Sequence, residues 1–246
     1  MIKKKIIVSL SAVLVSAAVI LLFCLYNGFV WFNNPGRKHF PVRGIDVSHH
    51  QKSIDWAKVS HSGIHFAYIK ATEGKDFRDT LFEHNWRESG KAGVKRGAYH
   101  FFTFRSSGRD QARHIIDVVP KEEGTLPPAI DLEFGGNSRN IPSRTDLAVE
   151  LKECLRMLES HYGVKPVIYA TYEAYEEYLT GEYHQYPLWI RDIFRKPDLK
   201  DGRNWVIWQY SNRGRMKGIP VYVDQNVFRG SRQELEEIVL QLPENE

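Results

Sequence analysis

Eight short runs rich in β-branched and aromatic residues recur between residues 42 and 228, and they constrain the fold more than any other feature. They cover residues 42–47, 65–70, 96–102, 128–134, 165–170, 187–192, 205–211 and 221–228. Helical patterns lie between and after them, at residues 78–92, 108–119, 144–161, 172–179 and 231–241. Strands that alternate with helices are typical of a (β/α)-barrel of the TIM type. Because the last three runs leave little room for helices, we predict an α/β fold with an irregular barrel of eight strands and few helices in its second half.

The N-terminal segment predicts a transmembrane helix in front of this barrel. Three lysines at positions 3–5 precede a run from Ile6 to Tyr26 that contains no charged residue. About 20 apolar residues are enough to cross a bilayer as a helix. A cleaved signal peptide is the alternative, but the run is long for one and ends in bulky residues without a small-x-small site. We expect an uncleaved anchor, with the lysines in the cytoplasm and the rest of the chain in the periplasm or outside the cell.

Charge and cysteine content narrow the partners. Of the 34 Lys and Arg residues, three precede the apolar run, which leaves 31 against 30 Asp and Glu residues. This balance gives no basis for binding nucleic acid, so we expect no nucleic-acid partner. Separately, we expect the protein to be a monomer. Cys24 lies in the apolar run and Cys154 in an expected helix, so we expect no disulfide between them.

The stretch "PPAIDLEF" at 127–134 places two carboxylates in a run that otherwise reads as a buried strand. Side chains two residues apart on a strand point to the same face, so Asp131 and Glu133 project together. Carboxylates on one face repel each other, so at least one tends to keep its proton near neutral pH. A protonated acid beside a base is what hydrolysis of a glycosidic bond requires. Pairing of both acids with arginines inside a barrel explains the spacing equally well.

Acidic and aromatic residues recur at the carboxyl ends of the expected strands, where barrels of this type carry their chemistry. A purely structural core does not collect acids there, because a buried unpaired carboxylate costs several kcal/mol. The residues at these ends are Asp46, Glu73, Tyr99, His100, Asp131, Glu133, Tyr169, Trp189, Arg191, Trp208, Gln209, Tyr210 and Asp224.

Seven segments follow one another in an order that suggests a known family. They are "GIDVSHHQKSIDW" (44–56), "FAYIKATEG" (66–74), "GVKRGAYHFF" (93–102), "PAIDLE" (128–133), "VIYAT" (167–171), "WQYS" (208–211) and "VDQNVF" (223–228). Over about residues 42–230 the chain resembles glycoside hydrolase family 25, the Chalaropsis-type lysozymes or muramidases. The resemblance implies an irregular (β/α)-barrel that cleaves the β-1,4 bond between N-acetylmuramic acid and N-acetylglucosamine in peptidoglycan. Ala129 stands where the longer acidic run of chitinase-like barrels has Asp, which counts against that class.

The resemblance also implies roles for individual residues. Glu133 matches the family's general acid, and Asp131 matches the second carboxylate of its D-x-E pair. Asp46 and Asp224 match the acids of the first and last strands. Whether Asp131 attacks the sugar directly or assists through the substrate's acetamide group stays open at this point. Peptidoglycan glycan strands are the implied partner, and no cofactor or metal is implied. The expected substrate-binding residues are Tyr99, Tyr169, Trp189, Arg191, Trp208, Gln209, Tyr210 and Glu73, with barrel core as the alternative for each aromatic.

One segment departs from the family pattern. Many members read W-[IL]-A-x-Y in the sixth strand, whereas this chain reads "WIRDIF" at 189–194. Strand alternation places Arg191 on the face of Trp189, and we expect both to face the barrel interior, with the guanidinium near an acid. Two other functions stay open beside a muramidase: a non-catalytic glycan-binding envelope protein, and a glycosidase of another specificity such as a chitinase. The chain then divides into a basic cytoplasmic tail (1–5), a transmembrane anchor or uncleaved signal (6–32), a spacer (33–41) and a catalytic barrel domain (42–246).

Overall fold

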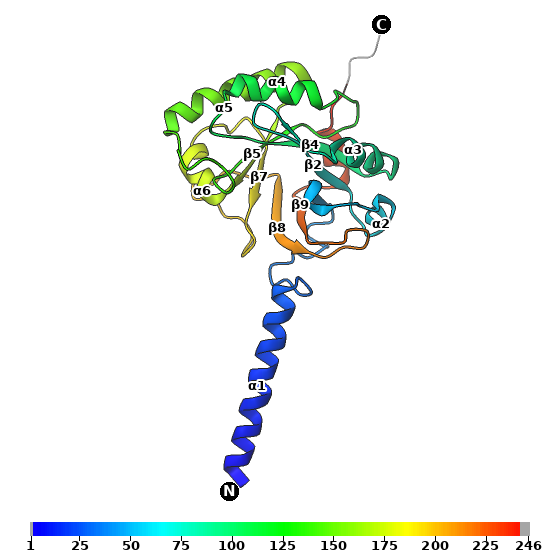
Figure 1. The fold of residues 1–246 in the computed structure, drawn as a ribbon, viewed down its shortest axis with the longest axis vertical. Helices are drawn as coiled ribbons and strands as arrows, with labels where there is room; N and C mark the ends of the chain where they lie inside the picture. Colours follow the sequence, from blue (N-terminus) through cyan, green and yellow to red (C-terminus); the bar gives the residue numbers. More distant parts are fainter. Residues whose placement is uncertain (1, 242–246) are drawn as a thin grey trace.

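The computed structural model describes residues 2–241, with side chains from residue 9 onward, and its main body is a closed barrel (Figure 1). The strands are β1 (Arg43–Val47), β2 (Phe66–Glu73), β4 (Lys95–Phe101), β5 (Ala129–Leu132), β6 (Val167–Thr171), β7 (Leu188–Arg191), β8 (Ile207–Gly214) and β9 (Val223–Phe228), and the two-residue β3 (Phe77–Arg78) forms a hairpin with β2. Their order is β1-β9-β8-β7-β6-β5-β4-β2, and pairing of β1 with β2 closes the ring. The predicted irregular barrel of eight strands is thus confirmed.

Strand direction explains why helices are sparse in the second half. Neighbouring strands are parallel from β1 through β2 to β8, but β9 runs antiparallel to both β8 and β1. Parallel neighbours need a long crossover, usually a helix, whereas antiparallel neighbours are joined by a short connection. The amino end of β9 therefore lies beside the carboxyl ends of the other strands, and Asp46 on β1 pairs in register with Asp224 on β9.

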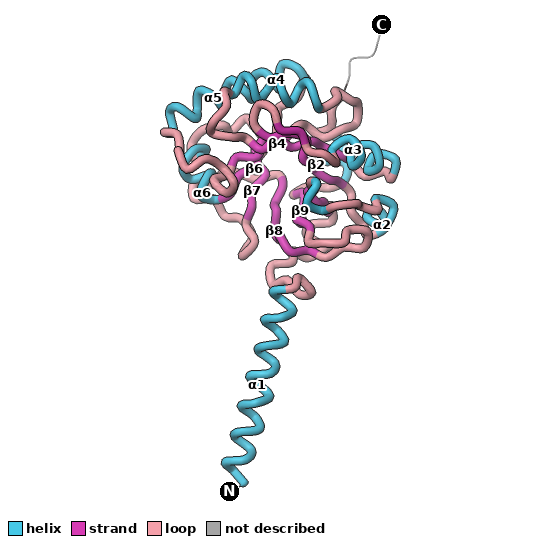
Figure 2. The backbone as a smooth tube through the Cα atoms, in the orientation of Figure 1, coloured by secondary structure: helices cyan, strands magenta, loops and turns pink. Residues whose placement is uncertain are grey.

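Helices cover the outside of the first half of the barrel (Figure 2). They are α2 (Trp56–His61), α3 (Phe82–Lys91), α4 (Gly108–Val118), α5 (Arg144–Tyr162) and α6 (Tyr172–Ala174), which continues into a π-helical turn, Tyr175–Leu179; α7 (Arg232–Glu237) follows β9. The predicted limits of α5 are confirmed, because Ser143 accepts a hydrogen bond from the backbone N–H of Asp146 and Gly163 ends the helix with φ of 76°. The 3₁₀ turn His49–Gln51 and α2 were not predicted.

Side chains fill the interior of the barrel below its carboxyl end. The interior cluster comprises Val42, Phe66, Tyr68, Leu126, Ala129, Val167, Tyr169, Trp189, Ile207, Phe228 and Leu235. A glycine opposite each of two large rings makes this packing possible. A Cβ on Gly44 would overlap the ring of Phe66, and one on Gly97 would lie 2.6 Å from the ring of Tyr68. The lower barrel is therefore a packed core, and open space is left only towards the carboxyl ends of the strands.

The N-terminal helix α1 (Ile2–Tyr26) extends away from the barrel beside β8 (Figure 1). Its 25 residues span about 37 Å, at 1.5 Å per residue, which exceeds the roughly 30 Å of a bilayer core. The segment Ser9–Tyr26 has a mean hydropathy of 2.4 and none of it is buried. The segment is thus long and apolar enough to cross a membrane, a property that signal sequences share.

Residues 27–42 pack along the outer face of the barrel instead of forming a free linker. The Trp31 indole N–H donates to the carbonyl oxygen of Tyr210 at 2.9 Å, and the Asn33 side-chain amide donates to that of Asp192 at 3.1 Å. Further along, the Phe40 ring lies 5.9 Å from the rings of Trp205 and Trp208. The expected spacer, residues 33–41, is therefore part of the packed domain.

Candidate active site

A cavity of about 530 Å³ opens at the carboxyl ends of the strands. Its lining residues are Asp46, Tyr99, Asp131, Glu133, Gly135, Tyr169, Trp189, Arg191, Gln209, Asn212 and Asp224. A larger hollow of about 740 Å³ lies beside α2 and α3, but its acids form exposed ion pairs, Asp55 with Lys58 and Glu88 with Lys91. The concentration of buried acids makes the smaller cavity the candidate site.

Strand β5 delivers two of these acids. Asp131 lies on β5 and Glu133 follows its last residue, and both line the cavity as the two-residue period predicts, while Leu132 packs in the outer core. Asp131 is 9% exposed, whereas Glu133 is half-buried. The Asp131 Oδ1 atom is buried and has no hydrogen-bond partner among residues 9–241. A buried acceptor left without a donor is rare and costly, which marks this oxygen as a candidate ligand-binding atom.

Burial raises the pKa of both carboxyls. For Asp131, burial raises the pKa well above its usual value, and the charge of Glu133 adds to the rise. For Glu133, burial also raises the pKa, while the nearby positive charge of Arg191 opposes the rise. Lys70 opposes the rise at both acids. The pair therefore holds at least one proton at a pH where isolated carboxyls are ionised, as an acid–base pair requires.

The second acid pair spans two strands. Asp46 Oδ2 accepts hydrogen bonds from the side-chain amides of Gln209, at 2.9 Å, and Asn226, at 2.7 Å. Asp46 and Asp224 also share a hydrogen bond, and burial together with the charge of Asp46 raises the pKa of Asp224 well above its usual value. Burial raises the pKa of Asp46 too, although its hydrogen bonds oppose the rise. The pKa of Asp224 is thus raised more strongly than that of Asp46, so Asp224 is the member of the pair that binds a proton more readily.

Aromatic side chains form one wall of the cavity and continue the same network. The Tyr169 hydroxyl donates to Gln209 Oε1 at 3.0 Å, and the Trp189 indole N–H donates to Asn226 Oδ1 at 2.9 Å. The rings of Tyr169 and Trp189 meet edge to face, with centroids 4.8 Å apart. Both amides that bind Asp46 are thus oriented by an aromatic donor, which fixes the network before any ligand arrives.

Arg191 lies in the cavity, as expected from its alternation with Trp189. Its positive charge lowers the pKa of Glu133, Asp46 and Asp224 relative to burial alone. The side chain is half-buried at the end of β7, so the guanidinium acts on several acids from the rim.

Three expected binding residues do not line the cavity. Trp208 and Tyr210 belong to the outer core cluster, since Gln209 between them points inward and alternation sends its neighbours outward. The Trp208 indole N–H donates to the carbonyl oxygen of Asp192. Glu73 pairs with Lys70 at 2.7 Å beyond the cavity. Trp208 and Tyr210 therefore lie outside this cavity, and Glu73 contacts Lys70, whose charge lowers the pKa of both β5 acids.

Three residues near the acids were missed. Lys70 is 9% exposed, lies 5.2 Å from the centroid of the Phe101 ring, and affects the pKa of both β5 acids. Asn226 is fully buried against Asp46, and Asn212 lines the rim. The alternation that identified the acids also points to two of them, because Lys70 is two residues from the interior Tyr68 and Asn226 is two residues from Asp224.

Comparisons with known proteins agree with this geometry. Residues 45–219 match the model of the glycosyl hydrolases family 25. The chain is 34% identical to lysozyme M1 of Streptomyces globisporus over 77% of this chain and 68% of that protein. It is 39% identical to the uncharacterized protein YegX of Escherichia coli K12, over 81% of this chain and 74% of that protein.

Among solved structures, a family 25 glycosyl hydrolase from Bacillus anthracis superposes with a TM-score of 0.80. The two chains are 43% identical, and the match covers 83% of this chain and 96% of that one. The family match covers well over half of the sequence and includes three of the four cavity acids, Asp46, Asp131 and Glu133. From the fold, the cavity and these matches, the chain belongs to family 25 of the glycosyl hydrolases.

Proposed function

We propose that this glycoside hydrolase is a lysozyme, an N-acetylmuramidase that cleaves the β-1,4 bond between N-acetylmuramic acid and N-acetylglucosamine in peptidoglycan. The observation that carries the proposal is the β5 pair, in which a deeply buried Asp131 with an unpaired oxygen lies beside a more accessible Glu133. Similarity to lysozyme M1 supports the choice of substrate.

Glu133 is the proton donor in this proposal. Burial raises the pKa of Glu133, which favours its protonated form, and its half-buried position leaves it within reach of a bound glycosidic oxygen. It protonates the leaving oxygen as the glycosidic bond breaks, and the resulting carboxylate then removes a proton from the attacking water.

Asp131 assists from below the donor. In the substrate complex Glu133 carries a proton and Asp131 is ionised, and the free Oδ1 of Asp131 accepts a hydrogen bond from the N–H of the substrate's acetamide. This contact directs the acetamide oxygen towards the anomeric carbon, and the carboxylate stabilises the positive charge that develops there. Direct attack by Asp131 on the anomeric carbon is the second route, which is the general scheme of retaining glycosidases with two carboxylates.

The remaining cavity residues bind and orient the sugar. Tyr99, Tyr169 and Trp189 offer rings against which a sugar face packs, and Gln209 stays fixed by Asp46 and Tyr169. Asp46, held by its amides and by Asp224, contributes negative charge on the wall opposite β5. Arg191 is placed to bind a carboxylate of the lactyl or peptide part of the substrate.

Digestion of purified peptidoglycan separates the candidate functions. We expect new reducing ends that are muramic acid, identified by mass spectrometry after reduction. Glucosamine ends would indicate a glycosidase of another specificity, and binding without new ends would indicate a glycan-binding protein. Glu133→Gln protein serves as the matched control for contaminating hydrolases.

We further propose that α1 anchors the protein, with the barrel on the periplasmic or outer side of the membrane. The uncharged run from Ile6 to Tyr26 follows three lysines that favour the cytoplasm, and none of Ser9–Tyr26 is buried. The protein should fractionate with membranes at 28.6 kDa and resist alkaline extraction. A mature N-terminus between residues 25 and 40 in the soluble fraction would overturn the anchor.

A further inference from the structure

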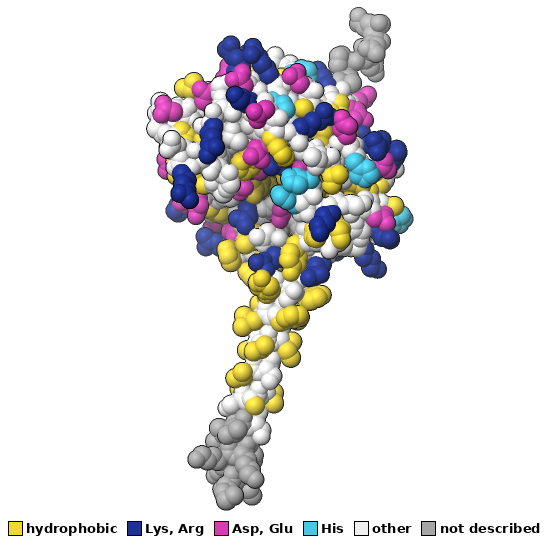
Figure 3. Space-filling model, viewed as in Figure 1, with side chains coloured by type: hydrophobic (Ala, Val, Ile, Leu, Met, Phe, Trp, Pro, Cys, Tyr) yellow, Lys and Arg dark blue, Asp and Glu magenta, His cyan; other side chains and the backbone are white. Residues whose placement is uncertain are grey.

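Exposed apolar side chains gather where α1 meets the barrel. Outside α1, four of the seven large apolar side chains that are exposed among residues 9–241 lie here: Phe29 (60% exposed), Val30 (49%), Phe32 (59%) and Phe194 (72%). The rings of Phe32 and Phe194 stack with centroids 6.3 Å apart, although they come from different parts of the chain. Figure 3 shows apolar side chains around the junction of the helix with the barrel. Soluble surfaces rarely expose such a cluster without a partner.

Two arginines border the cluster. The Arg213 guanidinium lies 4.7 Å above the Tyr26 ring and donates to the Tyr26 carbonyl oxygen at 2.6 Å. The Arg215 guanidinium lies 4.6 Å above the Phe29 ring. The segments 27–38 and 212–217 together contain five Lys or Arg residues and no acid. We call Phe29, Val30, Phe32, Phe194, Arg213 and Arg215 the junction patch.

The junction patch is fixed to the rim of the catalytic cavity. Arg191 lines the cavity, and the carbonyl oxygen of the next residue, Asp192, accepts a hydrogen bond from Asn33. Asn212 also lines the cavity, and Arg213 follows it. Adjacent Cα atoms are about 3.8 Å apart, so the patch begins within a few ångströms of the cavity rim formed by β7, β8 and β9.

We propose that the junction patch binds the surface of a bilayer that contains acidic phospholipids and holds the β7–β9 rim of the cavity at that surface. The aromatic rings enter the boundary between headgroups and acyl chains, and the arginines pair with lipid phosphates. The patch is continuous with α1, whose apolar surface ends at the same place. We therefore assign a membrane as the binding partner of the patch. This inference rests on the proposed anchoring of α1.

The consequence for the reaction is a restriction on where the glycan is cut. Because residues 27–42 are packed on the barrel, the cavity has no flexible tether with which to reach outward. The substrate of the docked enzyme is therefore glycan that lies next to the bilayer, in preference to glycan at a distance from it.

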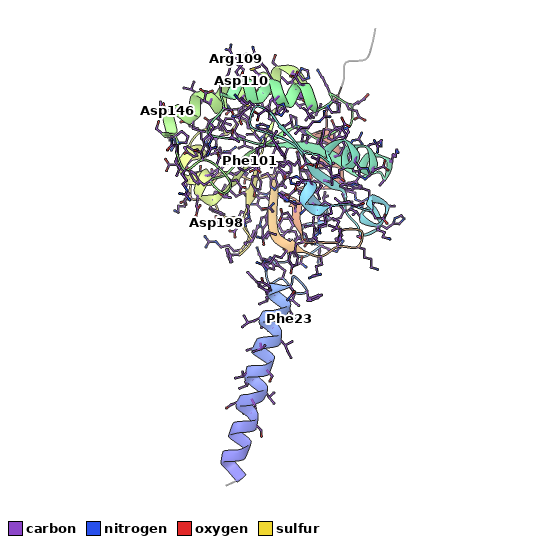
Figure 4. All side chains as sticks on the ribbon, in the orientation of Figure 1. Phe23, Phe101, Arg109, Asp110, Asp146 and Asp198 are labelled. Carbon is purple, nitrogen blue, oxygen red and sulfur yellow. The ribbon has the colours of Figure 1, made fainter. Side chains whose placement is uncertain are left out.

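Fluorescence quenching in vesicles tests the proposal on the full chain. Single cysteines replace Val15 in α1, Phe194 in the patch and Val149 on α5 in a Cys24→Ala background; Cys154 is fully buried and stays. Each protein carries an environment-sensitive dye on its new cysteine and is reconstituted into vesicles of phosphatidylglycerol and phosphatidylcholine. The vesicles also contain a nitroxide-labelled lipid that quenches the dye. The nitroxide lies near the glycerol backbone for the Phe194 and Val149 positions and deep in the acyl chain for the Val15 position. Position 149 is the control, because Asp146 on the same helix lies at the end of the barrel away from α1 (Figure 4).

We expect quenching at Val15 and Phe194 and none at Val149. If the dye at position 15 is quenched but the dye at position 194 is quenched no more than the one at position 149, the docking is overturned and the anchor remains. Lack of quenching at Val15 would overturn the anchor and the docking with it.

Charge variants test the lipid chemistry. The double substitution Arg213→Gln with Arg215→Gln should lower the ratio of docked to undocked protein by roughly 5-fold per arginine, the size of the attraction of one cation to an acidic membrane surface. Vesicles made of phosphatidylcholine alone should also lower the ratio of docked to undocked protein. The matched control is Arg109→Gln with Arg113→Gln on α4, where both side chains are exposed and Arg109 is distant from α1 (Figure 4). Equal effects of both double variants would exclude a specific role of the patch.

Discussion

Two pairs of acids face the same cavity, and their hydrogen-bond surroundings differ sharply. Asp46 accepts from two oriented amides and forms a hydrogen bond with Asp224, so that pair is satisfied by the protein itself. Asp131, by contrast, has a buried carboxyl oxygen without a hydrogen-bond partner among residues 9–241. The first pair is complete without substrate, whereas the second lacks the donor that a substrate N–H would supply.

The difference teaches which pair performs the chemistry. A satisfied pair contributes fixed charge and stability, and changing it leaves amide donors unpaired. An unsatisfied pair lowers stability in the free enzyme, and natural proteins retain such groups mainly at functional sites. Variants of the Asp131–Glu133 pair should therefore lose activity while keeping stability, whereas variants of Asp46 should lose stability.

The largest effect is expected at the proton donor. Glu133→Gln keeps shape and hydrogen bonding but has no proton to give, so kcat on peptidoglycan should fall at least ~10²-fold while binding persists. With an aryl glycoside whose leaving group needs no proton, the first step should recover much of its rate. Glu177→Gln, at an exposed glutamate, is the control. Near-normal turnover of Glu133→Gln on peptidoglycan would move the role of acid to Asp46 or Asp224.

Asp131→Asn should sharpen the contrast between the pairs. Loss of the charge near the acetamide should lower kcat by roughly 10²-fold, and an activated leaving group should not restore it. Thermal stability should stay equal or rise, because a buried carboxylate without a partner is replaced by a neutral amide. Asp46→Ala should instead lose about 1–3 kcal/mol of stability, since Gln209 and Asn226 are left without their acceptor. Equal melting temperatures for these two variants would contradict the distinction.

The pH dependence of stability gives a third comparison. The pKa values of Asp131 and Asp224 are raised on folding, so above about pH 4 the folded chain retains protons that the unfolded chain has released. The free energy of unfolding should therefore fall as pH rises through this interval, by up to about 1.4 kcal/mol per pH unit and group. Asp131→Asn and Asp224→Asn should each flatten the slope in thermal melts taken across pH. A slope unchanged in both variants would show that other groups dominate.

The smallest effect is expected at Arg191, whose charge reaches both pairs. Its removal lets the pKa of Glu133 and Asp224 rise further, so the alkaline limb of the activity profile of Arg191→Ala should move to higher pH. KM should also rise if the guanidinium binds substrate carboxylates, with little change in melting temperature. Arg195→Ala, whose side chain is 75% exposed, is the control. A large drop in melting temperature with normal kinetics would show that Arg191 is structural.

Sequence periodicity predicted much of this arrangement and failed where a distant segment decides the outcome. Alternation placed Asp131, Glu133 and Arg191 in the cavity from local spacing alone. In "WQYS", alternation separates Gln209 from its two aromatic neighbours but does not say which set faces inward. That choice follows from residues 27–42, which cover the outer face of β8 and pack on Trp208, and from Asp46, which binds Gln209. Neither contact is visible in the local pattern.

The packing of residues 27–42 also sets the lower limit of a chain that can fold. The family match begins at residue 45, but a truncated protein that starts there would lose Trp31 and Phe40 and expose the rings of Trp205 and Trp208, on which Phe40 packs. Uncovering large aromatic side chains costs roughly 1.5–3 kcal/mol each, a substantial part of the stability of an ordinary domain. A soluble version of this enzyme should therefore begin at residue 27 to 30, so that the segment up to residue 42 stays packed on the outer face of the barrel.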